Sequence, residues 1–153
     1  MRRKICCVTG HRDIAPEMID FVKKELHKEI VLAIKNGYSH FISGFAVGVD
    51  LIFADIVVEL KSEYFNITLE AAIPYRKRLE ARDKEFQRLI RKCDKVVIKS
   101  KHYTRSCFII RNLYMVEKSE RVIAVYDGRE KGGTEFTICK ARASQRELRI
   151  ISI

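Results

Sequence analysis

The sequence lacks a hydrophobic segment long enough for a signal peptide or a membrane span. The basic start, residues 1–4, leads into an apolar run of only five residues, 5–9. A signal-peptide core needs about 7–15 apolar residues, and a membrane-spanning helix needs about 20. We therefore expect a cytoplasmic protein with no membrane partner.

Cysteine and histidine are absent from the spacings that are typical of zinc and redox motifs. The five cysteines include no CxxC pair, and their odd number argues against a disulfide framework. Cys6 and Cys7 are adjacent in an apolar run, so we interpret them as small strand residues rather than metal ligands. No zinc-ligand spacing joins the cysteines to the four histidines, and we expect no metal.

Linkers, low-complexity tracts and internal repeats are also absent. A chain of 153 residues with 47% hydrophobic and 33% charged residues fits one globular domain spanning residues 1–153. The net charge of +10 favours anionic partners such as nucleotides, nucleic acid or acidic surfaces. The charge alone does not choose among these partners.

A regular alternation of strand and helix patterns is present. Short apolar runs predict strands at residues 5–9, 39–43, 66–73, 95–98, 121–126 and 148–153. Apolar residues at steps of three and four predict five helices. The first has Pro16 in its first turn and ends before Asn36-Gly37, three others lie at about 49–60, 76–93 and 134–144, and one contains Ile109, Leu113 and Val116. This alternation predicts an α/β fold: a single three-layer Rossmann-like domain, with a mostly parallel sheet of five to six strands and helices on both faces.

Two glycine-containing turns each join a predicted strand to a predicted helix. The first is 43–50, with Gly44 and Gly48, and the second is Gly132-Gly133-Thr134. Unpaired N–H groups and the helix dipole make a helix start attractive to an anion such as phosphate. Each turn alone is equally consistent with a simple tight turn, the second with Thr134 as N-cap, but two turns at one sheet edge favour an anion site. Neither matches the dinucleotide fingerprint or the P-loop, which the sequence lacks.

Other polar residues follow the predicted strands at the same edge, where ligands of parallel sheets bind. We predict that Arg12 and Arg111 supply positive charge to a phosphate, although a solvated arginine is the simpler alternative. Asp50 and Asp127 are suited to accept sugar hydroxyls, and Asp50 equally fits a helix-start acid. The predicted ligand-binding set is Thr9, Gly10, His11, Arg12, Ser43, Gly44, Gly48, Asp50, Arg111, Asp127, Gly132, Gly133 and Thr134.

Three further features have weaker functional interpretations. His11 and His102 are of the type that acts as acid or base, although a loop histidine is more often merely exposed. Tyr103 is suited to stack on a base. The basic segment 76–93 offers charges to a nucleic-acid backbone, but acidic residues interleave and no aromatic series is present. We interpret that segment as a solvated helix face.

Taken in order, four motifs resemble the SLOG superfamily, with the YpsA-like branch as the nearest match. They are Thr9-Gly10-His11-Arg12, Ser43-Gly44-x-x-x-Gly48-Val49-Asp50, Arg111-Asn112-x-x-Met115 and Gly132-Gly133-Thr134. The resemblance spans nearly the whole chain. It implies a Rossmann-like fold that binds a nucleotide or an ADP-ribose-like ligand at the glycine turns, as a sensor or regulatory protein and with no further cofactor. A homo-oligomer is left open.

Two other SLOG branches provide alternative functions. LOG-like phosphoribohydrolases hydrolyse nucleoside monophosphates and have an Arg-x-x-x-Met helix that Arg111 matches, which makes this residue a candidate for catalysis. Their catalytic glutamate corresponds by spacing to Thr137 here, while the nearby Glu135 would point elsewhere on the helix. DprA-like proteins bind single-stranded DNA through a Ser-Gly-x-Ala-Arg-Gly-Ile-Asp turn, in which this chain has Val47 at the arginine position.

Overall fold

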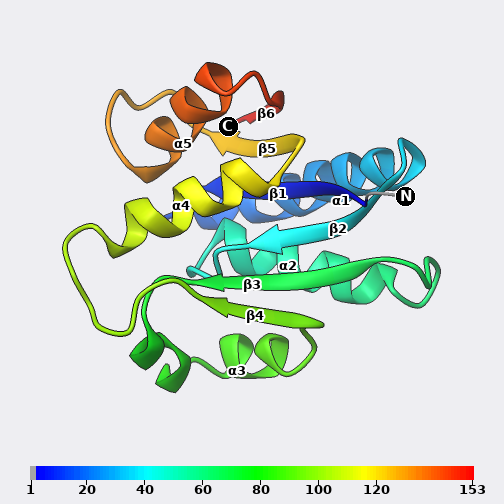
Figure 1. The fold of residues 1–153 in the computed structure, drawn as a ribbon. Helices are drawn as coiled ribbons and strands as arrows, with labels where there is room; N and C mark the ends of the chain where they lie inside the picture. Colours follow the sequence, from blue (N-terminus) through cyan, green and yellow to red (C-terminus); the bar gives the residue numbers. More distant parts are fainter. Residues whose placement is uncertain (1–2) are drawn as a thin grey trace.

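Six parallel strands form one sheet in the computed structural model, which describes residues 3–153 (Figure 1). Every pair of neighbouring strands is parallel, and the strand order is β4-β3-β2-β1-β5-β6. The predicted parallel α/β sheet is therefore confirmed, with six strands. The strands are β1 (Lys4–Gly10), β2 (Tyr38–Ser43), β3 (Thr68–Ile73), β4 (Lys95–Ile98), β5 (Arg121–Tyr126) and β6 (Glu147–Ser152).

Helices cover both faces of the sheet, as the alternating pattern predicts. On one face lie α1 (Ile19–Lys35), α2 (Val49–Leu60) and α3 (Lys84–Ile90), while α4 (Cys107–Lys118) and α5 (Gly133–Ala143) lie on the other (Figure 1). Two short 3-10 helices, η1 (Pro16–Met18) and η2 (Arg76–Glu80), precede α1 and α3. This arrangement gives the three layers expected when each strand is followed by a helix that packs back on the sheet.

The central strand β1 divides its side chains between the two layers. Cys6 and Val8 belong to the larger core under α1 and α2, whereas Cys7 belongs to the smaller core under α4 and α5. Both cysteines are fully buried and free, and burial raises the pKa of the Cys7 thiol to about 12. The interpretation of these cysteines as small strand residues fits this environment.

The single helix predicted at 76–93 is wrong, because the chain breaks between η2 and α3. The Asp83 carboxylate accepts hydrogen bonds from the backbone N–H groups of Glu85 at 2.9 Å and Phe86 at 3.3 Å, and it thereby caps α3. An aspartate at this position starts a new helix and does not continue an old one. Helical periodicity on both sides of the break conceals it in the sequence.

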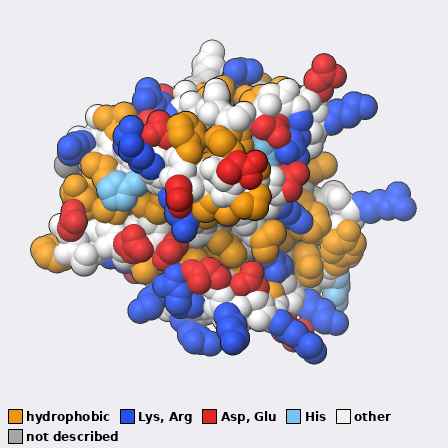
Figure 2. Space-filling view, turned by 180° about the vertical axis from the view of Figure 1, so that it is seen from behind, with side chains coloured by type: hydrophobic (Ala, Val, Ile, Leu, Met, Phe, Trp, Pro, Cys, Tyr) orange, Lys and Arg blue, Asp and Glu red, His pale blue; other side chains and the backbone are white. Residues whose placement is uncertain are grey.

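Basic and acidic side chains lie side by side along the surface of this segment. Figure 2 shows the basic side chains projecting at the edge of the molecule where η2 and α3 lie, with acidic ones beside them. Arg88 pairs with Asp55 at 2.8 Å and also with Glu85.

No helix within residues 3–153 is long and apolar enough to cross a membrane.

A buried polar cluster lies between β2, β3 and α4. His40 Nε2 lies 2.7 Å from Glu70 Oε1, His40 Nδ1 lies 2.6 Å from the Thr68 hydroxyl, and the Tyr114 hydroxyl donates to Glu70 Oε2 at 2.6 Å. Burial alone would raise the pKa of Glu70, but hydrogen bonds from His40 and Tyr114 hold it below its ordinary value. The buried carboxylate is thus fully provided with partners.

Strand order reverses direction at β1, which lies between β2 and β5. From β1 the chain adds β2, β3 and β4 on one side, then returns to place β5 and β6 on the other. In open parallel sheets, ligands bind beyond the carboxyl ends of the strands at such a switch point. The carboxyl ends of β1, β2 and β5 are therefore the first place to look for a site.

Candidate functional site

A cavity of about 440 Å³ opens at the carboxyl ends of the central strands. It is enclosed by the end of β1, the turn before α2, and the helices α4 and α5. We call it the main cavity. Its lining residues are Val8, Thr9, Gly10, His11, Arg12, Asp13, Ala46, Asp50, Phe108, Arg111, Asn112, Met115, Arg129, Gly132, Gly133, Thr134 and Thr137.

Most of the predicted ligand-binding residues meet at this cavity. Nine of the thirteen line it, namely Thr9, Gly10, His11, Arg12, Asp50, Arg111, Gly132, Gly133 and Thr134. The other four, Ser43, Gly44, Gly48 and Asp127, do not line it. The turn at 132–134 therefore contributes all of its predicted residues to the cavity lining, whereas the turn at 43–50 contributes only Asp50 of its predicted residues.

The N-terminus of α5 is open toward the main cavity. Its N-cap is Gly132, at φ 133°, and no side chain caps the helix, so Thr134 is not the N-cap. The first intrahelical bond runs from the N–H of Phe136 to the carbonyl oxygen of Gly132 at 3.0 Å. Within residues 3–153, no acceptor is bound by the N–H groups of 133–135 or by the Thr134 hydroxyl. Unpaired donors at the positive end of a helix dipole are an arrangement that attracts anions.

The N-terminus of α2 is closed by the protein's own backbone. Its first N–H, that of Val49, donates to the carbonyl oxygen of His11 at 3.3 Å. A Cβ added at Gly48, where φ is 88°, would lie 2.6 Å from that oxygen and 2.8 Å from the carbonyl oxygen of Arg12. Gly48 therefore allows the loop after β1 to pass directly over the helix start, which leaves no room there for a phosphate.

Asp50 and Ser43 complete the closure of α2. The Asp50 carboxylate accepts the N–H of Ala46 at 3.2 Å, and the Ser43 hydroxyl donates to the Asp50 carbonyl oxygen at 2.9 Å. Burial raises the pKa of Asp50, and the charge of Arg111 partly offsets that effect. The carboxylate thus supplies the negative charge that favours this helix end.

Arg111 is buried between the two glycine turns, with 5% of its surface exposed. Its Nη1 donates to the carbonyl oxygen of Gly44 at 2.6 Å, and its Nε donates to the side-chain oxygen of Asn112 at 2.8 Å. A Cβ added at Gly44 would lie 2.8 Å from both Arg111 Nη1 and Asp50 Oδ2, so only glycine admits these two groups. Burial lowers the pKa of Arg111, and Asp50 counteracts the effect. The guanidinium keeps its charge, since its ordinary pKa lies above 12.

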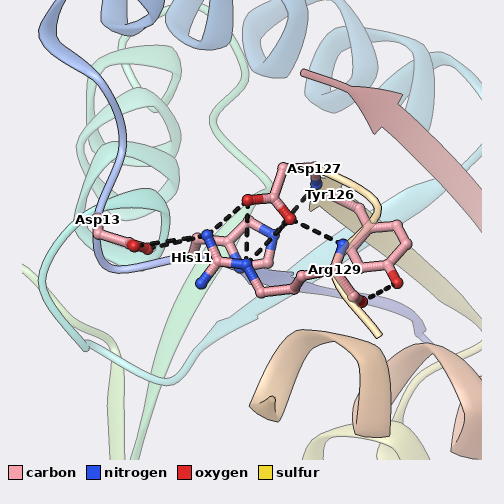
Figure 3. A network of polar contacts seen from close by, with 5 residues as sticks. All are labelled: His11, Asp13, Tyr126, Asp127 and Arg129. Atoms are coloured by element: carbon pink, nitrogen blue, oxygen red, sulfur yellow. Dashed lines mark hydrogen bonds and ion pairs between the residues drawn. The ribbon is translucent and has the colours of Figure 1, made fainter. Parts of the chain in front are cut away.

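Polar contacts at the other side of the cavity join the ends of β1 and β5 (Figure 3). The Asp127 carboxylate binds Arg129, whose Nε lies 3.0 Å from each carboxylate oxygen. The backbone N–H of Asp127 donates to His11 Nε2 at 3.2 Å. Arg129 also reaches Asp13 at 3.3 Å. Burial lowers the pKa of His11 against the attraction of Asp127, whose carboxylate oxygen Oδ1 lies 3.2 Å from His11 Nε2. Asp127 therefore positions Arg129 and His11 at the wall of the cavity.

The remaining sequence candidates lie elsewhere. Glu135 accepts a hydrogen bond from the Cys139 thiol at 2.9 Å and does not line the main cavity. His102 is exposed, and Tyr103, 63% exposed, packs edge-on against Tyr75 and Phe108. Val47 is 44% exposed.

The sequence reasoning missed Phe108 and Arg129 as lining residues. Phe108 lies three residues before Arg111 on α4, and residues three apart share a helix face. That spacing was the available signal for Phe108. Arg129 carried no comparable signal, because its position depends on its contacts with Asp127 and Asp13.

The YpsA family model, described as the YspA SLOG family, matches residues 6–153. The chain belongs to the YpsA SLOG family. The chain is similar to UPF0398 proteins of Bacillus cereus strain ATCC 14579, 24% identical, and of Bacillus thuringiensis strain Al Hakam, 23% identical. Each match covers 91% of this chain and 83% of the relative. The name UPF0398 specifies no activity.

Three solved structures share the fold of this YpsA SLOG chain. DNA processing protein A (DprA) of Helicobacter pylori, described for its single-stranded DNA binding mode, superposes with a TM-score of 0.72 at 18% identity, covering 96% of this chain and 64% of its own. TM1055 gives 0.61 at 19% identity, covering 95% and 72%. The Moco carrier protein of Chlamydomonas rheinhardtii gives 0.55 at 13% identity, covering 99% and 78%. At these identities the likeness shows the fold alone.

Proposed function

We propose that this YpsA SLOG protein binds a phosphate-bearing nucleotide or an ADP-ribose-like ligand in the main cavity, as a cytoplasmic sensor or regulatory protein. The observation that carries the proposal is the open N-terminus of α5, which shares one cavity with Arg12 and Arg111. Neither arginine has a carboxylate within ion-pair distance among the described residues. Unpaired donors and unpaired positive charge in one enclosed space favour a phosphate.

A phosphoryl group is best accommodated at the start of α5. There it would accept hydrogen bonds from the N–H groups of 133–135 and from the Thr134 hydroxyl. Arg111 Nη2 makes no hydrogen bond within residues 3–153, so it is available to the same anion. The exposed Arg12 can close over it from the loop after β1.

The rest of the main cavity suits a nucleoside. Its volume of about 440 Å³ lies in the range of small-molecule sites, about 300–1,000 Å³. Phe108 and Met115 offer apolar surface to a base, and Asn112 offers a side-chain amide. Asp50 is the buried carboxylate at the cavity that can accept a sugar hydroxyl, whereas Asp127 is engaged with Arg129.

Calorimetric titration tests the proposal directly. The panel contains adenosine, AMP, ADP, ADP-ribose, cyclic ADP-ribose and inorganic phosphate, with parallel guanine nucleotides. We expect the phosphorylated compounds to bind and adenosine to bind much more weakly, because the phosphate site supplies the charged contacts. A folded protein that binds no member of the panel would contradict the proposal.

Two exposed arginines give a matched pair of variants. Arg12→Ala removes a charge at the main cavity, while Arg91→Ala removes a charge at the end of α3. Neither side chain makes an ion pair or hydrogen bond within residues 3–153, so both variants should fold. Losing one charge-assisted hydrogen bond costs about 1.5–3 kcal/mol. We therefore expect Arg12→Ala to weaken nucleotide binding by at least about ten-fold and Arg91→Ala to leave it unchanged.

Hydrolysis and DNA binding are less well supported by the site. The catalytic glutamate of the LOG-like pattern has no counterpart on α5 that faces the main cavity, because Thr137 stands at its position and Glu135 contacts Cys139. Val47 leaves the turn before α2 without the arginine of the DprA pattern. Base release from AMP that is lost in Arg111→Ala would establish the first activity. Oligonucleotide binding that weakens steeply with salt would establish the second.

A further inference from the structure

A second, smaller cleft opens beside the main cavity. Its volume is about 240 Å³, and Arg12, Ala46, Phe108 and Arg111 line both spaces. Arg78, from η2, lines this cleft and not the main cavity. We call it the arginine cleft. The two spaces adjoin at these shared side chains.

The three arginines of this cleft have no paired carboxylate. Arg78 Nη2 donates to the carbonyl oxygen of Phe45 at 3.0 Å, Arg111 binds carbonyl and amide oxygens, and Arg12 makes no hydrogen bond within residues 3–153. By contrast, Arg88 and Arg129 each pair with two carboxylates. Three positive charges therefore converge at the cleft, and Asp50 is the buried carboxylate among the acidic residues near them.

Mutual repulsion among these arginines contributes to the lowering of their pKa values. Burial is the main cause that lowers the pKa of Arg78 and of Arg111, and the charge of Arg12 adds to the lowering of both. Asp50 offsets only part of this repulsion. An anion in the cleft would relieve it.

Aromatic rings hold the guanidinium groups in place. Arg78 lies over Phe86 at 4.5 Å from the ring centroid, and Arg12 and Arg111 lie 5.3 and 5.9 Å from the centroid of Phe108. Stacking on a ring engages the face of a guanidinium and leaves its N–H edge free. The charges are thus positioned before any ligand arrives.

We propose that the arginine cleft is a second anion subsite, so that the ligand carries at least two phosphoryl groups, as a nucleoside diphosphate or a diphosphate-linked nucleotide does. One phosphoryl group would lie at the start of α5 and the other among Arg12, Arg78 and Arg111. A nucleoside monophosphate would leave the cleft empty. The inference rests on the proposed function, because it extends the same ligand from the main cavity.

Titration of AMP, ADP and ADP-ribose into wild type and Arg78→Ala tests the second subsite. We expect ADP and ADP-ribose to bind wild type about ten-fold more tightly than AMP. Because Arg78 lines only the cleft, Arg78→Ala should remove most of that advantage and change AMP binding by less than about two-fold. Thermal unfolding of each variant confirms that the comparison is made on folded protein.

A second pair of variants keeps the test valid if Arg78→Ala folds poorly. Val47 is exposed and lines the arginine cleft but not the main cavity. Val47→Glu places a negative charge at the cleft, and Val47→Gln is its neutral match in size. We expect Val47→Glu to weaken ADP binding several-fold more than Val47→Gln does, with AMP binding similar in both.

The possible failures are distinguishable. If no nucleotide binds wild type, the proposed function itself is contradicted. If AMP and ADP bind equally and Arg78→Ala affects both alike, the second subsite is overturned while the nucleotide site remains. If a five-residue oligothymidylate binds more tightly than ADP and loses affinity in Arg78→Ala, the cleft serves a nucleic-acid strand and the diphosphate ligand is overturned.

Discussion

Helices α2 and α5 begin alike in sequence and differ in what covers them. Each starts at a glycine with positive φ after a parallel strand, Gly48 at 88° and Gly132 at 133°. At α2 the loop after β1 lies over the turn, and Asp50 supplies the negative charge. At α5 no segment of residues 3–153 covers the turn, and a Cβ at Gly132 would meet no atom closer than 3.9 Å. A glycine turn can therefore receive an anion only where a third segment leaves it open.

The largest effect should come from filling the covered turn. We expect Gly48→Ala to lower the free energy of unfolding by about 3 kcal/mol or more, from strained backbone and overlap with the His11 carbonyl oxygen. Gly128→Ala is the control, since Gly128 has the same φ of 88° and nothing within 4 Å of an added Cβ. Its loss should be about 1 kcal/mol. Urea unfolding measures the free energy of unfolding of both variants. Equal losses would show that backbone strain alone causes the destabilisation, without overlap at Gly48.

Removing the charge at the start of α2 should have the next largest effect. In Asp50→Asn the amide oxygen can still accept the Ala46 N–H, but Arg111 loses the attraction of a nearby negative charge. We expect the free energy of unfolding to fall by about 2 kcal/mol, because the positive end of the α2 dipole loses its carboxylate. Urea unfolding at neutral pH measures the loss. An unchanged stability would mean that Asp50 is protonated in the folded protein, the direction in which burial shifts its pKa.

A smaller effect is expected on the open side, at α5. The Thr134 hydroxyl is unpaired within residues 3–153, whereas the Thr137 hydroxyl donates to the Gly133 carbonyl oxygen at 2.8 Å. Thr134→Val should weaken AMP binding by about 1 kcal/mol, the worth of one hydrogen bond. Thr137→Val, also at the cavity, should change it less. Calorimetry compares the two variants, and an equal loss in both would place the phosphate elsewhere.

The smallest effect should be the pH dependence that His11 confers. Its pKa is lowered in the folded protein by burial, so the unfolded chain takes up the proton first as pH falls below 6.5. Stability should therefore decline from pH 6.5 downward. His11→Gln should reduce the drop in melting temperature between pH 7.5 and 5.5. The pKa values of Glu70 and Asp127 are also lowered, but these carboxyl groups change the stability only below about pH 4.5. They therefore do not contribute to the difference between pH 7.5 and 5.5. A drop as large in the variant as in wild type would contradict the assignment to His11.

Sequence patterns predicted the sheet well because they depend on local burial. Continuous apolar runs such as that in β1 mark strands covered on both faces, and the structure extends that strand only to Lys4–Gly10. The break before α3 was missed because apolar spacing continues across it. Asp83, followed by Phe86 three residues later, was the local sign of a helix start.

The candidate site was predictable only in part. Residues that end a strand or follow one, such as Thr9 in β1 and Thr134 at the start of α5, follow from the parallel fold, because the carboxyl ends of the strands share one edge. Two other features depend on how distant segments pack. The His11 carbonyl oxygen lies against Gly48, and Arg78 reaches from η2 to the carbonyl oxygen of Phe45. No local pattern encodes such contacts. For this reason the sequence patterns predicted the same anion-binding role for both glycine turns.

The cluster of His40, Glu70 and Tyr114 has a consequence for how the strands align. In the observed register, His40 faces Thr68 and Ile42 faces Glu70 across β2 and β3. Slipping β3 by one residue would turn Glu70 to the opposite face of the sheet, among the apolar side chains under α2. A carboxylate without donors there would be costly to bury. The buried carboxylate thus selects one alignment among those that apolar strands alone would tolerate.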